Sequence, residues 1–300
     1  MDLTARVMQN LSVLASVLLA QLIFITLLLA NPALAQVTLL IPARPDINKT
    51  QPKKAQAKTQ ATKDEAGIRE ETDILITRMH AFSNECFSMD TPQSFTVLLY
   101  RRTEPIVDGH PKPLRGDLLG DVEEILYKGK KAWGANVALT SPGLYHFLLE
   151  TKPWWNDAQT CFMQHFVKVM LPVFGDDTGW DEQSGQRFEI VPQTRPFGLL
   201  APALFQGTVL FEGKAQPNCL VILERINTDN QKVPTPWHES QVFKTNANGQ
   251  FTAVRNRSGW WCARALREGP PLKGADGQPK AFTMGALYWF FVDSENFQSR

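Results

Sequence analysis

Short runs of alternating apolar and polar residues follow one another along the chain, separated by turns rich in glycine, proline and asparagine. Alternation with a period of two residues is typical of strands that bury one face. In the first half this pattern predicts a hairpin over 122–139, turning at Lys128–Lys130, and a loop over 103–116. The other predicted strands of this half span 36–45, 72–82, 94–102, 144–151 and 161–174.

The second half is denser in strand-like runs and shows no helical periodicity. The dipeptide Asn248-Gly249 lies between two alternating runs and predicts a hairpin there. Regularly spaced short strands with turn signals between them favour a β-sandwich. The predicted strands span 187–193, 203–213, 219–227, 241–254, 259–269 and 285–293.

Two polar segments divide the chain. Residues 46–67 contain no large apolar run and many Lys, Gln, Thr and Ala residues, so we expect a flexible linker. Residues 175–185 are acidic and rich in turn-forming residues, and we place a domain boundary there. The resulting prediction is an all-β protein with a short strand and linker over 36–70, an N-terminal β-sandwich over 71–185 and a C-terminal β-sandwich over 186–295.

The first 35 residues have the layout of an export signal. Arg6 precedes an apolar run, Leu11–Ala30, and Asn31-Pro32 ends that run. Ala33-Leu34-Ala35 is a small-x-small triplet, which predicts cleavage after Ala35 of a signal peptide over 1–35. The run is also long enough for an uncleaved membrane anchor, since about 20 apolar residues span a bilayer. Both interpretations place the following residues outside the cytoplasm, in the periplasm or cell envelope, with membrane contact only through a retained helix.

Charge and motifs exclude several functions. The chain has 31 Lys and Arg against 30 Asp and Glu, and this balance gives no sign of a nucleic-acid partner. The sequence contains no GxSxG, HExxH, P-loop or GxGxxG motif. We therefore expect a protein that is not an enzyme. A single apolar span also cannot build a channel or permease.

The four cysteines are compatible with an oxidising compartment. No two of them form a CxxC pair, which removes the usual signal for a zinc ribbon or a thioredoxin-like site. Pairing within each proposed domain favours disulfides Cys86–Cys161 and Cys219–Cys262. The alternative is four buried thiols that act as small apolar side chains.

Candidate metal ligands come from two predicted strands and one turn. His165 shares a strand face with apolar residues, so it is either a metal ligand or a core histidine with its hydrogen bonds satisfied. His146 lies on one strand face with Glu150, which gives a possible His/Glu pair. Asp181 belongs to an acidic cluster in the 175–185 turn, and hard cations bind such oxygen atoms. The alternative for this cluster is solvated linker charge.

Adjacent tryptophans occur twice, as Trp154-Trp155 and Trp260-Trp261. Neighbours on a strand point to opposite faces. One member of each pair is therefore expected in the core, and the other at the surface, where it would mark an interaction site.

Several segments resemble successive motifs of one family, the periplasmic nickel/cobalt-transport-associated proteins, which include a domain of unknown function. The resemblance covers 141–293 well and the earlier residues loosely. It is carried by KPWW at 152–155, QHFVKV at 164–169, VFGDDTGWD at 173–181, FEIVPQTRPFGL at 188–199, FQGTVLFEGK at 205–214, TNANGQF at 245–251, SGWW at 258–261 and the segment 274–292.

The resemblance implies a periplasmic component of a nickel or cobalt uptake system that works with a membrane permease. It also implies a C-terminal half like an immunoglobulin or carboxypeptidase-regulatory domain. His165 matches the family pattern, but Gln36 stands where relatives often have His, and 82–85 lacks a Thr-His-Pro motif. The resemblance therefore suggests a bound Ni or Co ion. The two missing histidines favour the alternative, a metal-independent interaction or structural protein of the envelope.

Overall fold

A computed structural model describes residues 36–48 and 70–295. Apart from two 3-10 turns, η2 (Leu119–Asp121) and η3 (Pro236–His238), the regular structure of these residues consists of strands. The predicted all-β fold is confirmed. The predicted signal peptide over 1–35 and most of the predicted linker lie outside the described residues.

In the described part of the chain, no helix has the length and apolar character needed to span a bilayer.

A five-stranded sheet is built from β1 and four other strands of the first half of the chain. Its strand order is β1-β2-β9-β8, with β3 paired to β2. The bounds are β1 (Val37–Pro42), β2 (Glu70–Met79), β3 (Cys86–Phe87), β8 (Val122–Tyr127) and β9 (Lys130–Leu139).

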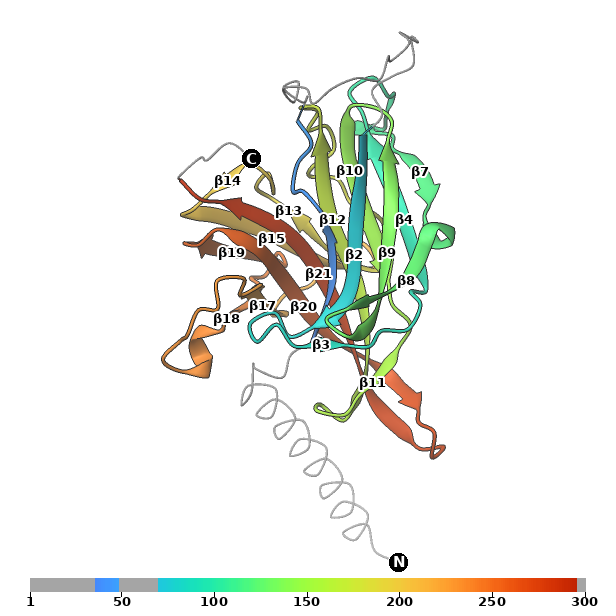
Figure 1. Ribbon diagram of the computed structural model, residues 1–300, viewed down its shortest axis with the longest axis vertical. Coiled ribbons are helices and arrows are strands. Elements are labelled where there is room, and N and C mark those ends of the chain that lie inside the picture. The colour runs from blue at the N-terminus through green and yellow to red at the C-terminus, as the bar shows by residue number, and fades with distance from the viewer. Residues whose placement is uncertain (1–35, 49–69, 296–300) are drawn as a thin grey trace, which may run out of the picture.

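A ten-stranded sheet forms the middle of the molecule (Figure 1). Its order is β18-β17-β20-β21-β12-β10-β4-β7, and β11 and β14 pair with β12 and β21. The bounds are β4 (Ser94–Tyr100), β7 (Leu114–Asp117), β10 (Gly143–Glu150), β11 (Trp154–Asn156), β12 (Cys161–Val173), β14 (Leu199–Leu200), β17 (Leu220–Arg225), β18 (Ser240–Lys244), β20 (Gly259–Lys273) and β21 (Pro279–Asp293).

A four-stranded sheet comes from the second half and has the order β13-β15-β16, with β19 paired to β15. Its strands are β13 (Phe188–Pro192), β15 (Ala203–Phe211), β16 (Lys214–Ala215) and β19 (Gln250–Arg255). A small ribbon of β5 (Ile106–Val107) and β6 (His110–Pro111) completes the set.

The ten-stranded sheet buries both of its faces, because each face packs against one smaller sheet. Alternate residues of a strand point to opposite faces. Odd-numbered residues of β10 and β12, such as Phe147 and Val169, join the core beneath the five-stranded sheet, together with Leu40 and Ile76. Even-numbered residues, such as Leu148 and Phe166, join the core beneath the four-stranded sheet. The molecule thus contains two sandwich cores that share one sheet.

The boundary predicted at 175–185 does not divide the molecule into two domains, because the ten-stranded sheet and both cores contain residues from either side of it. Strand β12 from the first half pairs in parallel with β21 from the second, with Phe162 opposite Phe282 and Val169 opposite Trp289. A polar, turn-rich segment marks a surface connection, but it carries no information about which distant strands pair.

Among the described strands, β1 pairs only with β2, and side chains of β20 and β21 bond to it and to the preceding Gln36. Arg264 on β20 donates through Nη1 to the Gln36 carbonyl at 3.1 Å. The indole Nε1 of Trp289 on β21 donates to the Thr38 carbonyl at 2.9 Å. These bonds satisfy acceptors of an edge strand that is buried inside the protein.

Three local predictions differ from the structure. The turn at Asn248-Gly249 forms, but β18 and β19 on either side belong to different sheets, so it is not a hairpin. The predicted loop 103–116 contains β5 and β6, together with the start of β7. At the start of the predicted flexible linker, Ile47 is buried and bridges to Val173. Each difference arises from pairing with a strand that is distant in sequence or from a short strand pair, and the local pattern of apolar and polar residues does not predict such pairing.

Candidate functional site

The predicted metal ligands do not converge. His146 lies opposite Met170 in the β10–β12 register, so its side chain shares a face with the even-numbered residues of β12. His165 therefore points to the other face of the ten-stranded sheet. Among residues 36–48 and 70–295, no three His, Cys, Asp or Glu side chains lie close enough together to hold a metal ion. The predicted set of His165, His146, Glu150 and Asp181 is thus not one site.

His165 is fully buried in a polar cluster between the ten-stranded sheet and β1. Its Nδ1 lies 2.8 Å from Thr38 Oγ1, and its ring meets the Trp154 ring edge-on at 4.7 Å. Burial, together with repulsion from Arg264 and Arg78, holds the pKa of His165 well below its usual value. The imidazole is therefore neutral and lies within the field of two guanidinium groups.

His146 occupies a comparable position in the other core. Its ring lies 4.6 Å from that of Tyr100, and burial and the nearby Lys168 hold its pKa well below the usual value. Lys168 forms a buried ion pair with Glu189 on β13, with Nζ to Oε2 at 2.8 Å. The backbone and hydroxyl of Ser184 also donate to this carboxylate, at 2.9 and 2.6 Å. This pair links the central sheet to the four-stranded sheet.

The two acidic candidates lie apart from the histidines. Glu150 accepts hydrogen bonds from Gln93 and Gln164 at 3.2 and 3.0 Å, and burial raises its pKa. Asp181 is exposed. Its neighbour Glu182 pairs with His110 at 3.0 Å. The carboxylates of the 175–185 turn are therefore exposed or paired with surface side chains. This agrees with the alternative prediction, in which the acidic cluster is solvated linker charge and not a metal site.

The expected disulfides are absent, and all four cysteines are free thiols. Cys219 directly precedes β17. In the β17–β20 register, Cys262 lies opposite Glu224, which is five residues beyond Cys219. That offset is roughly 16 Å along a strand, well beyond the reach of a disulfide. Cys86 and Cys161 lie in different sheets. Three of the thiols are buried and Cys219 is half-buried, and burial raises the pKa of Cys219 to about 11, so the alternative of unreactive thiols fits these residues better than disulfides.

The two side chains of each tryptophan pair lie on opposite strand faces, but only Trp261 is a buried core residue. Trp261 is buried in the core beneath the four-stranded sheet, while Trp260 packs on the edge of the other core. Trp155 is 39% exposed, and Trp154 is half-buried beneath the Arg78 guanidinium at 4.9 Å. Trp260 is the member of these pairs that reaches a large groove.

This groove, here called the Trp260 groove, is lined by residues of β1, β2, β8 and β9 together with Trp260, and has a volume of about 790 Å³. Its apolar surface includes Ile41, Leu75 and Ile125, and exposed carboxylates lie at its rim. The acidic residues that line it are Asp73, Asp121 and Glu123. An apolar floor with a rim of one charge sign is a surface suited to a partner of opposite charge.

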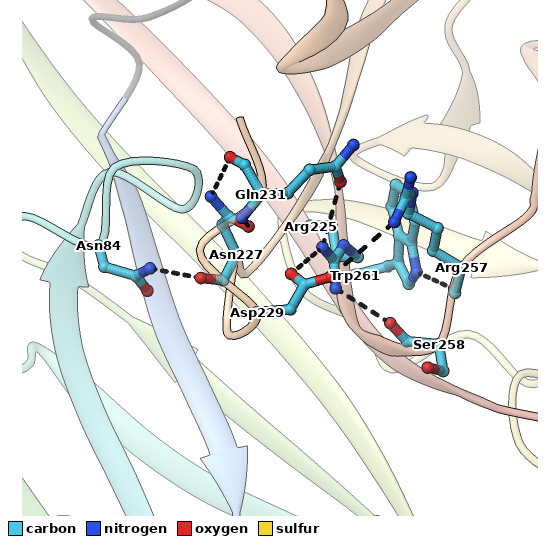
Figure 2. A network of polar contacts seen from close by, with 8 residues as sticks. All are labelled: Asn84, Arg225, Asn227, Asp229, Gln231, Arg257, Ser258 and Trp261. Atoms are coloured by element: carbon cyan, nitrogen blue, oxygen red, sulfur yellow. Dashed lines mark hydrogen bonds and ion pairs between the residues drawn. The ribbon is translucent and has the colours of Figure 1, made fainter. Parts of the chain in front are cut away.

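A second cleft, here called the arginine cleft, has a volume of about 330 Å³ and lies between β17, β18 and the loop 226–239. Figure 2 shows the polar network along its wall, in which Arg225 and Arg257 both face Asp229. Asn227 Nδ2 donates to the Gln231 carbonyl at 3.0 Å, and Asn84 Nδ2 donates to the Asn227 carbonyl at 2.7 Å. These bonds fix the loop that forms one side of the cleft.

Sequence reasoning did not identify the arginine cleft, although one signal was present. The run 250–255 alternates so that Phe251, Ala253 and Arg255 share a face, and the first two are core residues. A charged residue at an inward-facing position is rare unless it is paired or functional.

The model of a family described as a domain of unknown function, DUF4198, matches residues 51–269. No curated protein matches the chain significantly.

The solved structures that match this chain include two distant ones. The D0-D1 domain of intimin is 10% identical, with a TM-score of 0.20 over 86% of this chain and 100% of that one. The tandem V-type regions of VCBP3, a v-region-containing chitin binding protein, are also 10% identical with a TM-score of 0.20, over 84% of this chain and 99% of theirs. Matches at this level carry no argument about this chain.

Proposed function

Because this chain belongs to the DUF4198 family, a domain of unknown function, we propose its role from its own geometry. It is an exported, non-catalytic interaction module of the cell envelope that acts without a metal ion. The observation that carries this proposal is the Trp260 groove, an apolar depression of about 790 Å³ with an acidic rim.

The surroundings of the two buried histidines support the metal-independent role. Arg264 and Arg78 act on His165, and Lys168 acts on His146. Like charges in a region of low dielectric repel strongly, so a divalent cation would be disfavoured beside either imidazole. The histidines instead belong to polar clusters within the two cores.

The chemistry of the Trp260 groove supports one class of partner. Apolar side chains cover its floor, and three carboxylates, Asp73, Asp121 and Glu123, line it. The occupant we propose is a segment of another envelope protein in which an apolar residue is flanked by lysine or arginine. The apolar residue would pack on Trp260, and the basic side chains would meet the rim.

Binding to an array of short peptides of varied charge tests this role. Peptides that combine an apolar residue with Lys or Arg are expected to bind, and a chelator should not change their affinity. Trp260→Ala should weaken binding about tenfold or more, because an aromatic anchor typically contributes 2 kcal/mol or more to an interface. Asp121→Asn with Glu123→Gln should weaken it mainly at low salt.

Trp237→Ala is the matched control, since Trp237 is 68% exposed and lies outside the Trp260 groove. This variant should bind the same peptides as the unmodified protein. The proposal is wrong if no basic, apolar peptide binds, or if Trp260→Ala binds them unchanged.

A second candidate is an accessory protein of nickel or cobalt uptake that passes the ion to a membrane permease. The observation that favours it is the position of the residues after the predicted cleavage site. Thr38 contacts His165, and the side-chain oxygen of Gln36 and Nε2 of His165 are both buried without a hydrogen-bond partner among the described residues. An imidazole thus lies near the start of the predicted mature chain.

Titration calorimetry separates the two roles. The metal-independent role predicts no heat beyond dilution when Ni²⁺ or Co²⁺ is added to the metal-free protein. Saturable binding that His165→Ala removes and His110→Ala retains would support the uptake role instead. His110 is 70% exposed at its side chain, so that control leaves the core intact.

A further inference from the structure

Behind the wall of the arginine cleft lies a buried cation, Arg255, that has no anionic partner among the described residues. Arg255, the last residue of β19, is 0% exposed, and its guanidinium lies 4.7 Å from the centre of the Trp261 ring. Its hydrogen bond is from Nη2 to the side-chain oxygen of Gln241 at 2.8 Å. Nε and Nη1 are buried and have no hydrogen-bond partner among the described residues. Gln241 and Trp261 both line the arginine cleft, so the guanidinium lies directly behind its wall.

The other charges at the cleft are largely balanced. Arg225 and Arg257 share the carboxylate of Asp229. Glu239 also lines the cleft, and His238 beside it contacts the Thr235 hydroxyl, so the two arginines and the two carboxylates together carry no net charge. The remaining acid nearby, Glu224, is buried and paired with Arg264 at 3.4 Å. Burial lowers the pKa of Arg255 to about 10, as expected for a charge without a counter-ion. A buried, unpaired charge is costly, and one added negative charge would offset that cost.

We propose that the arginine cleft binds a saccharide that carries a carboxylate, and that this carboxylate pairs with Arg255. A single unpaired guanidinium matches the single charge of a carboxylate better than a phosphate group, which carries about −1.5 to −2 at neutral pH. The ligand carboxylate takes the place of the Gln241 side-chain oxygen as the acceptor for Arg255 Nη2. Its second oxygen accepts a hydrogen bond from Arg255 Nε or Nη1, because a planar guanidinium suits two-point contact with a carboxylate.

The rest of the lining suits a sugar ring. Trp237, 68% exposed on η3, offers an aromatic face at the rim on which the C–H face of a ring can pack. Gln231, Gln241 and Asn256 provide amide donors and acceptors for hydroxyl groups. The volume of about 330 Å³ lies at the lower end of the range for small-molecule sites, roughly 300–1,000 Å³.

Binding of D-glucuronate, measured by calorimetry against D-glucose and acetate, tests the proposal. Glucuronate is expected to bind saturably and at least tenfold more tightly than either comparison compound, since a charge-assisted hydrogen bond is worth roughly tenfold or more. Trp237→Ala should weaken binding several-fold without changing the melting temperature, because this side chain is exposed.

Gln241→Glu is the decisive variant, because it places a carboxylate of the protein itself beside Arg255. We expect a higher melting temperature and loss of glucuronate binding. Gln278→Glu makes the same charge change at the exposed tip of the β20–β21 hairpin and should alter neither property. Equal binding of glucose would overturn the carboxylate assignment, and equal binding of acetate would overturn the saccharide assignment. Unchanged binding by Gln241→Glu would remove Arg255 from the site.

Discussion

Replacing Lys168 with methionine is expected to lower the free energy of unfolding by about 3–5 kcal/mol, because the change leaves the Glu189 carboxylate buried without its counter-ion. The side chains of Lys168 and Glu189 are 1% and 2% exposed, with 2.8 Å between Nζ and Oε2. Guanidinium unfolding at neutral pH measures the loss. The variant Lys168→Met with Glu189→Gln removes both charges and should lose less than the single substitution. Equal losses would show that packing, and not charge pairing, determines the effect.

The same pair makes stability depend on pH. Burial alone would raise the pKa of Glu189, but Lys168 and the hydrogen bonds from Ser184 outweigh it and hold the pKa below its usual value. A carboxylate with a depressed pKa in the folded state stabilises the protein fully above its unfolded pKa of about 4.3. That contribution is lost as the pH falls through the lower folded value. In Glu189→Gln this part of the acid dependence should disappear.

Trp289→Ala is expected to cost about 3–5 kcal/mol of unfolding free energy, the usual range for removing a large buried aromatic side chain. Trp289 is 0% exposed, and its indole donates to the Thr38 carbonyl at 2.9 Å. Chemical denaturation followed by circular dichroism checks this value. The substitution creates a cavity and also leaves a carbonyl of β1 without its donor.

Trp289→Phe separates these two causes, because it removes the donor and keeps most of the packing. It should cost about 1–3 kcal/mol, the price of an unsatisfied buried acceptor. A loss equal to that of Trp289→Ala would assign the whole effect to the hydrogen bond. A loss near zero would show that the Thr38 carbonyl finds another donor.

The strands themselves were predictable, because alternation is a local property. The run 144–151 and the hairpin 122–139 form nearly as predicted, and the turn between β8 and β9 uses left-handed conformations at Lys128 and Gly129. The opposite orientation of Trp260 and Trp261 also followed from the period of two. These features depend only on neighbours in sequence.

Pairing between strands was not predictable in the same way. Nothing within β12 indicates that its partner is β21, and the expected boundary at 175–185 failed for that reason. The cysteines show the same limit, since an even number of them says nothing about the distances between them. A disulfide needs two nearby backbones, and here the register places Cys219 and Cys262 far apart.

For the candidate site residues too, the sequence predicted the strand face of a side chain but not its partners. The sequence placed His165 correctly on an apolar strand face, and the structure adds Thr38 as its hydrogen-bond partner. Arg255 carried only the hint of an inward-facing charge. Arg255 is a candidate binding residue because no carboxylate lies beside it in the described structure. That fact follows only from the tertiary structure, which shows where the acidic side chains pair.

The bonds from Arg264 and Trp289 to β1 have a consequence for how the chain assembles. Their partners are 228 and 251 residues apart. A ribosome adding about 5–20 residues per second needs roughly 10–50 s to make the intervening chain. During that time an apolar strand has been made but the side chains that hold it have not. The first strand of the described structure is therefore among the last to receive all of its bonds, and a chain cut short before β21 would leave it exposed to aggregation.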